Sequence, residues 1–120
     1  NYFATASDEL CLVVQIETVE GMKNLEAIAR TDGVDAIFVG PADLSASMGF
    51  PGEPNHPEVL AAIKDIIMRM RANNIPAGLM CLDPVAAKGY LEMGASFVAV
   101  GVDLVLLANA VSNLRGEFEG

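Results

Sequence analysis

The sequence contains no tryptophan, one histidine, two cysteines and only seven lysine and arginine residues among 120. With so few basic residues and a formal net charge of −9, it does not fit a general nucleic-acid binder, because such proteins neutralise phosphates with clustered lysines and arginines. Cys11 and Cys81 lie far apart inside apolar runs, which is neither metal-ligand spacing nor a dense disulfide framework. We therefore expect two buried free thiols.

Long apolar runs are also missing. No run reaches the roughly 18 to 20 residues of a membrane span, and no charged-then-apolar leader opens the sequence, so we expect a cytoplasmic protein without a membrane partner. Apolar residues make up 52% of the chain, and 120 residues are enough for one domain with a core. Residues 1–120 are expected to form a single unit.

Four short apolar runs predict the strands of a sheet. They are nearly continuous rather than alternating in polarity, as expected for parallel strands buried on both faces. Helical patterns lie between them, most clearly over residues 56–74, where apolar side chains recur every three or four positions. The other helices are expected over residues 21–31, 84–93 and about 104–115. The predicted strands are residues 11–17, 34–40, 75–81 and 97–103.

This alternation predicts an α/β fold, either an open doubly wound sheet or a (β/α) barrel. In both folds the chemistry gathers at the carboxyl ends of the strands. Carboxylates stand at or just beyond three predicted strand ends: Glu17, Asp43 and Asp103. Gln15 and Glu17 are two residues apart on one strand, so their side chains are expected on the same face.

The residue types at these strand ends indicate a divalent metal. Two carboxylates with little else suit Mg²⁺ or Mn²⁺ better than Zn²⁺, which prefers histidine and cysteine. In the segment GPADL, Gly40 allows a close backbone approach, and the amides of Ala42 and Asp43 open toward a helix start, where small anions bind. The alternatives are that the two carboxylates cap the following helices and that GPADL is an ordinary turn.

Three segments closely resemble the metal-dependent, class II pyruvate aldolases of the HpcH/HpaI type, which act on 4-hydroxy-2-oxoheptanedioate, 2-dehydro-3-deoxyglucarate or 2-keto-3-deoxyrhamnonate. The segments are LVVQIETVEG, GVDAIFVGPADLSASMGFPGEPNHPEV and GASFVAVGVDL. The resemblance implies a (β/α)8 TIM barrel and a carbon–carbon lyase that cleaves a 4-hydroxy-2-oxo acid to pyruvate and an aldehyde. It also implies a homo-oligomer, a hexamer in the parent family, that takes a small 2-oxo acid as its substrate.

The same resemblance implies roles for individual residues. Glu17 and Asp43 match the ligands of the divalent metal ion, which is Mg²⁺, Mn²⁺ or Co²⁺. Gln15 matches a substrate contact, and the backbone amide of Ala42 matches the group that holds the pyruvate carboxylate. The full set of implied substrate-binding residues is Gln15, Gly40, Pro41, Ala42 and Asp43.

A complete (β/α)8 barrel needs roughly 200 residues or more, so we expect only part of one, about four βα units. The resemblance matches these units to the last four of the family's barrel, which implies its C-terminal half. The resemblance places the proton-transferring residues and the oxyanion-stabilising arginine in the other half, so this chain is assigned no catalytic residue. Two alternatives stay open. One is a non-catalytic half-barrel that associates through its open sheet edges. The other is a citrate lyase-like enzyme that cleaves CoA esters.

The remaining charged residues are assigned structural places. Lys23, Lys64 and Lys88 fall on predicted helices, which disfavours a Schiff-base aldolase, because that enzyme needs a lysine inside its pocket. His56 is expected at the entry of a helix. Surface positions on helices are expected for the four arginines, Arg30, Arg69, Arg71 and Arg115.

Overall fold

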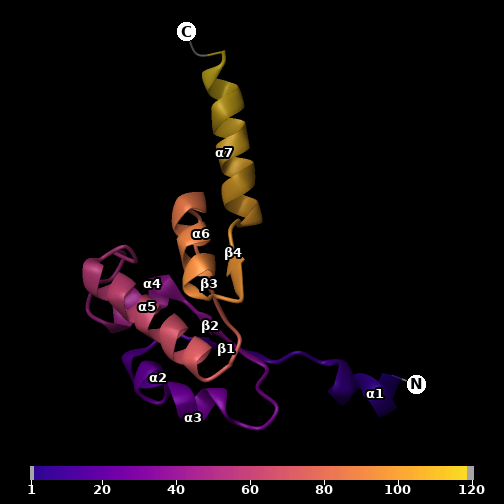
Figure 1. Cartoon of the computed structure of the whole chain (residues 1–120). Coiled ribbons are helices and arrows are strands. Elements are labelled where there is room, and N and C mark those ends of the chain that lie inside the picture. Colours follow the sequence, from indigo (N-terminus) through magenta and orange to yellow (C-terminus); the bar gives the residue numbers. More distant parts are fainter. Residues whose placement is uncertain (1, 119–120) are drawn as a thin grey trace.

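The computed structural model describes residues 2–118. Each predicted strand is present, although shorter than predicted, and the four form one parallel sheet in the order β1-β2-β3-β4. The strands are β1 (Val13–Ile16), β2 (Ala36–Val39), β3 (Ala77–Met80) and β4 (Phe97–Ala99). The helices are α1 (Tyr2–Glu9), α2 (Val19–Lys23), α3 (Leu25–Ala29), α4 (Pro41–Ser47), α5 (Pro57–Ala72), α6 (Pro84–Met93) and α7 (Asp103–Gly116). Figure 1 shows their arrangement.

The hydrophobic core lies between one face of the sheet and the helices α3 to α6. Ile16, Ile37 and Leu79 point from the strands into this core and are almost completely buried. Burying an aliphatic side chain of this size contributes about 1.5–3 kcal/mol. The helical members of the core come mainly from α5, whose buried residues are Val59, Ala62, Ile63, Ile66, Ile67 and Met70.

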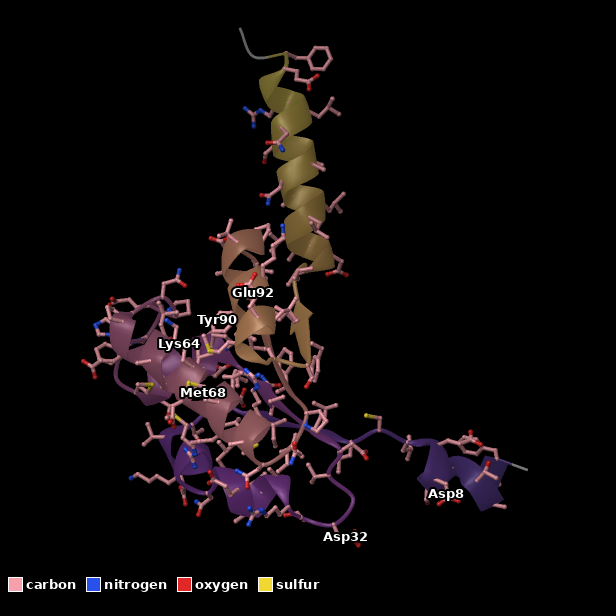
Figure 2. The ribbon with its side chains drawn as sticks, viewed as in Figure 1. Asp8, Asp32, Lys64, Met68, Tyr90 and Glu92 are labelled. Atoms are coloured by element: carbon pink, nitrogen blue, oxygen red, sulfur yellow. The ribbon has the colours of Figure 1, made fainter. Side chains whose placement is uncertain are left out.

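The two longest core-facing helices begin and end as their sequences predict. Pro57 and Pro84 occupy the first turns of α5 and α6, where a missing N–H group is harmless. Helix α6 ends at Gly94, whose φ of 118° lies in the left-handed region. Tyr90 reaches from α6 toward α5 (Figure 2) and is buried, which raises the pKa of its hydroxyl.

The other face of the sheet is open in the described chain. Val13, Met80 and Phe97 lie on this face with 42%, 39% and 36% of their surface exposed. The prediction that the strands are buried on both faces therefore holds for most of the central strands β2 and β3 but was wrong for the edge strands β1 and β4. Their apolar side chains on this face meet no covering element among residues 2–118.

The prediction of two buried thiols was also wrong. Cys11 is exposed and Cys81 is partly exposed, and both are free. Cys11 precedes β1 at an edge of the sheet where the described chain places no neighbouring strand. An apolar residue is buried only where another element covers it, and at Cys11, the start of its run, no element among residues 2–118 does so.

Helices α1 and α7 project from the rest of the molecule (Figure 1), and neither has a buried residue. As a result the Cα radius of gyration is 17.3 Å. A compact domain of this length would have a radius of about 14 Å. No helix among residues 2–118 is long and apolar enough to cross a membrane. The large apolar residues that α7 exposes are Leu104, Val105, Leu106, Leu107, Val111 and Leu114.

The helix predicted over residues 21–31 is two short helices, α2 and α3, which meet at Asn24. The arginine prediction needs a correction here as well. Arg69 does not simply face solvent from α5, because its Nε donates to the Glu26 carboxylate of α3 at 2.7 Å. The Nη1 group of Arg69 donates a second hydrogen bond to the carboxylate of Asp65, one turn earlier on α5. Arg69 thus fastens α3 to α5.

We expect Glu26→Gln to lower the midpoint of thermal unfolding at pH 7. The hydrogen bond from Arg69 lowers the pKa of Glu26 from 4.5 to about 2, so the carboxylate stabilises the fold above pH 4.5. That contribution fades as the pH falls from 4.5 toward 2. The difference between wild type and variant, measured by circular dichroism across this range, should shrink accordingly. Glu92→Gln, at an exposed position, is the control; an equal loss there would contradict the prediction.

Candidate functional site

The side chains of Gln15 and Glu17 lie against Gly40 at the carboxyl ends of β1 and β2. A Cβ atom at position 40 would lie 2.6 Å from Gln15 Nε2 and 3.0 Å from Glu17 Oε2. Gly40 has an ordinary φ of −96°, so a glycine is needed here for space and not for its conformational freedom. The two side chains share one face of β1, as their spacing predicted, and this is the open face of the sheet.

Helix α4 begins directly at this point. Gly40 is its N-cap residue, Pro41 is its first residue, and Asp43 lies in its first turn. Because glycine has no side chain, the cap position of α4 provides no side-chain hydrogen bond to the helix. The first amides of a helix have no carbonyl partner one turn earlier, and this applies to the N–H group of Ala42. Ala42 and Asp43 are both exposed.

The strand-end carboxylates divide into two kinds. Asp83 caps α6 by accepting a hydrogen bond from the N–H of Val85 at 2.7 Å, and Asp103 accepts one from the N–H of Leu104 at 2.7 Å. Within residues 2–118, the carboxylates of Glu17 and Asp43 have no such bond and no ion pair.

The capping interpretation of Glu17 and Asp43 was therefore wrong. Thr18 caps α2 through its hydroxyl, which accepts from the N–H of Gly21 at 2.9 Å, and Gly40 occupies the cap position of α4. Neither acid stands where a cap must stand. Two carboxylates without protein partners thus lie near the junction of β1, β2 and α4, since Glu17 contacts Gly40 and Asp43 follows it by three residues.

A hydrogen bond that the sequence did not predict joins the segments that carry these acids. The N–H of Val19, two residues after Glu17, donates to the Ser47 hydroxyl at the end of α4 at 3.0 Å. The buried Ser45 hydroxyl donates in turn to the carbonyl oxygen of Ala42 at 2.7 Å. Val19 and Ser47 are 28 positions apart, so no short sequence pattern could have indicated their contact.

The donor set at this junction fits a hard divalent cation. The residues described include no group of three or more histidine, cysteine, aspartate or glutamate side chains that could enclose a metal. Two carboxylates instead match the way Mg²⁺ is bound, through one or two carboxylates with several coordination positions left to water or substrate. They do not match zinc, which takes nitrogen and sulfur ligands.

The other polar candidates lie elsewhere. Lys23, Lys64 and Lys88 are exposed on helices α2, α5 and α6, as predicted, and Figure 2 shows Lys64 on α5. His56 is the N-cap of α5 and its Nδ1 accepts from the N–H of Glu58, which confirms its place at a helix entry. Its ring stacks on Phe50 with the centroids 3.7 Å apart.

The model of the HpcH/HpaI aldolase/citrate lyase family matches residues 3–110. The chain belongs to this family. It is 51% identical over 119 residues to the hydroxypyruvate/pyruvate aldolase of Pseudomonas aeruginosa, with 99% of this chain and 44% of that protein covered. It is 52% identical over 118 residues to the 4-hydroxy-2-oxo-heptane-1,7-dioate aldolase of Salmonella heidelberg, covering 98% of this chain and 45% of that protein.

The fold agrees with a solved member of the family. The crystal structure of an HpcH/HpaI aldolase/citrate lyase family protein from Burkholderia cenocepacia matches with a TM-score of 0.90 and 34% identity. The match covers 99% of this chain and 46% of that protein, so the chain spans about half the length of its relatives. The four-stranded sheet is thus half of a (β/α)8 barrel, which confirms the predicted fold class.

We expect Gly40→Ala to displace the Gln15 amide and the Glu17 carboxylate while lowering the free energy of unfolding by no more than about 1 kcal/mol. This is the low end for an added methyl group, because the closest atoms are the ends of side chains that can move. Gln15 is the only glutamine in the sequence, so ¹⁵N-glutamine labelling gives one side-chain amide to follow by NMR.

Gly89→Ala is the matched control, because a Cβ at that helical position would have no atom within 4 Å apart from its chain neighbours and the backbone of its own helix. It should leave the Gln15 signals in place and raise the free energy of unfolding by about 0.5–1 kcal/mol. Unmoved Gln15 signals in Gly40→Ala would contradict the packing described here.

Proposed function

We propose that this chain contributes the metal-binding half of an aldolase site, in which Glu17 and Asp43 hold Mg²⁺, Mn²⁺ or Co²⁺. The whole protein would cleave a 4-hydroxy-2-oxo acid to pyruvate and an aldehyde. The observation that carries the proposal is the pair of carboxylates at the strand ends that neither cap a helix nor bind another side chain within residues 2–118. Unpaired carboxylates beside an open sheet face are available to a cation.

The residues around the carboxylates suit the 2-oxo acid end of such a substrate. Gln15 places an amide over Gly40, and an amide can donate to a keto or carboxylate oxygen. The N–H of Ala42 opens the first turn of α4 and can donate to the substrate carboxylate, while Pro41 fixes the chain there. A bound divalent ion would act as a Lewis acid toward the negative charge that develops on the pyruvate part.

The names of two relatives support the substrate class. They are aldolases for hydroxypyruvate and pyruvate and for 4-hydroxy-2-oxo-heptane-1,7-dioate. Proton transfer needs groups that the described strand ends do not provide, since His56 caps α5 and Arg69 pairs with Glu26. We therefore assign those steps to residues beyond this half of the barrel. The proposal includes a cytoplasmic homo-oligomer, a hexamer as in the family the sequence resembles.

We expect the chain to bind Mn²⁺ in a calorimetric titration and to bind it more tightly when pyruvate is present. Asp43→Asn and Glu17→Gln should each weaken the Mn²⁺ affinity at least tenfold, because even residues that only support a metal ligand change affinity by about 10–100-fold. Pyruvate should strengthen binding in wild type because it would share the metal with both carboxylates.

Asp32→Asn is the matched control for charge. Asp32 is exposed in the turn after α3, away from the strand ends, and Figure 2 labels it. This variant should bind Mn²⁺ as wild type does. Equal affinity in wild type and Asp43→Asn would overturn the metal assignment.

A second candidate is a non-catalytic half-barrel that associates through its open edges, and it is favoured by a specific observation. No residue of α7, which follows the edge strand β4 and projects from the rest of the molecule, is buried, and Val13 and Phe97 on the edge strands are exposed as well. Exposed edges of a parallel sheet invite pairing. A CoA-ester lyase is the weaker alternative, because the lysines lie on three separate helices and form no basic site for the CoA phosphates.

If the second candidate is right, sedimentation equilibrium should give a mass at least twice 12.6 kDa at micromolar concentration. Leu107→Lys should then reduce the association, because Leu107 lies on α7 with 64% of its surface exposed. Asn109→Lys on the same helix adds the same charge without removing an apolar side chain and serves as the control. A folded wild-type monomer would count against obligatory pairing.

A further inference from the structure

Four residues form a row across the open face of the sheet. Strand pairing places Gln15 opposite Phe38, Phe38 opposite Gly78, and Gly78 opposite Phe97. Their neighbours in the chain, Ile16, Ile37 and Leu79 among them, point to the opposite, buried face. The row therefore links the two edge strands, β1 and β4, just below the strand ends that carry the candidate site.

Gly78 lets the two aromatic rings of this row meet. A Cβ atom at position 78 would lie 2.5 Å from two ring atoms of Phe97 and 2.5 Å from its carbonyl oxygen, so the Phe97 ring occupies the space over the glycine. The rings of Phe38 and Phe97 are stacked, with centroids 6.0 Å apart and an angle of 19° between their planes. Phe97 thus reaches across β3 to contact Phe38 on β2.

A side chain also lies over a glycine at the other edge of the sheet, although this glycine is not its register partner. The Gln15 amide reaches across to the space over Gly40, where its Nε2 would be 2.6 Å from a Cβ atom. Phe38 lies at the level of Gln15 on the neighbouring strand, about 4.8 Å away in the pairing direction. Gln15 and Phe38 are thus neighbours in the row, and the Gln15 side chain extends from this level toward the strand end, over Gly40.

This aromatic pair is not part of the hydrophobic core. The core cluster and the side chains packed against it include neither Phe38 nor Phe97, and 36% of the Phe97 surface is exposed. Offset stacking of two rings contributes only about 0.5–1.5 kcal/mol beyond the area it buries.

We propose that Phe97 is a positioning residue for the candidate site. By holding the Phe38 ring in place across Gly78, it keeps the Gln15 amide over Gly40 and beside the Glu17 carboxylate. The inference rests on the proposed function in taking the Gln15 amide as a contact of the 2-oxo acid. The position of the amide itself is a separate matter that can be measured without metal or substrate.

The first test follows the single glutamine side-chain amide in ¹⁵N-glutamine-labelled protein. Phe97→Ala is expected to move or broaden the Gln15 side-chain signals, and Phe97→Leu, which retains most of the bulk, is expected to move them less. Phe118→Ala removes a ring that is 82% exposed just beyond α7 and should leave them unchanged. Thermal unfolding of each variant identifies any general loss of structure, in which case Phe97→Leu is the variant that decides.

The second test repeats the Mn²⁺ titration with and without pyruvate. Phe97→Ala should bind Mn²⁺ alone with the wild-type affinity. The factor by which pyruvate increases the Mn²⁺ affinity should fall about tenfold, which corresponds to roughly one hydrogen bond to a charged group. A purely structural role would change the unfolding midpoint and leave this ratio as it is.

The outcomes separate the two proposals. Unmoved Gln15 signals in a folded Phe97→Ala variant would overturn the positioning role, whatever the metal does. Moved signals with an unchanged pyruvate effect would overturn it too, because the amide position would then not matter to the ligand. Moved signals in a protein that binds no Mn²⁺ would support the positioning of Gln15 and count against the proposed function instead.

Discussion

The alternation of side chains along the four parallel strands is the constraint on which the rest of the structure depends. One set of side chains, including Ile16, Ile37 and Leu79, must pack against α3 to α6, and their burial holds the sheet and helices together. The other set is thereby turned toward the open face. A shift of one residue in any strand would exchange the two sets and expose the core. The free-energy cost of exposing the core therefore also keeps the polar groups of the candidate site on the open face.

The packing of side chains on the open face depends in turn on its glycines, which have no side chain. Gly40, directly after β2, and Gly78, on β3, leave room that is filled by side chains from the β1 and β4 sides of the sheet. The edges of this sheet are consequently not independent of its centre, although no hydrogen bond between side chains connects them across the described strands.

The sequence predicted the fold well because short apolar runs and helix periodicity are local signals. The sequence analysis did not distinguish the acids that cap a helix from those that do not, although the position of proline would have done so. Asp83 stands immediately before Pro84 and caps α6, whereas Asp43 follows Pro41 and lies inside α4. What remained unpredicted depends on distant partners. The hydrogen bond from Arg69 to Glu26 spans 43 positions. Cys11 is exposed because no other described element packs over it, and a local sequence pattern cannot indicate whether one does.

The order of the strands also bears on how the chain acquires its structure. Among residues 2–118 each strand pairs with the strands that come directly before and after it in the sequence: 23 positions separate Val13 from Ala36, 40 separate Ile37 from Ala77, and 19 separate Gly78 from Phe97. These separations limit the entropy lost in closing each loop, because that loss grows with loop length. As the chain leaves the ribosome, each new βα unit therefore meets a partner strand that has already emerged, and the sheet can grow in the direction of synthesis.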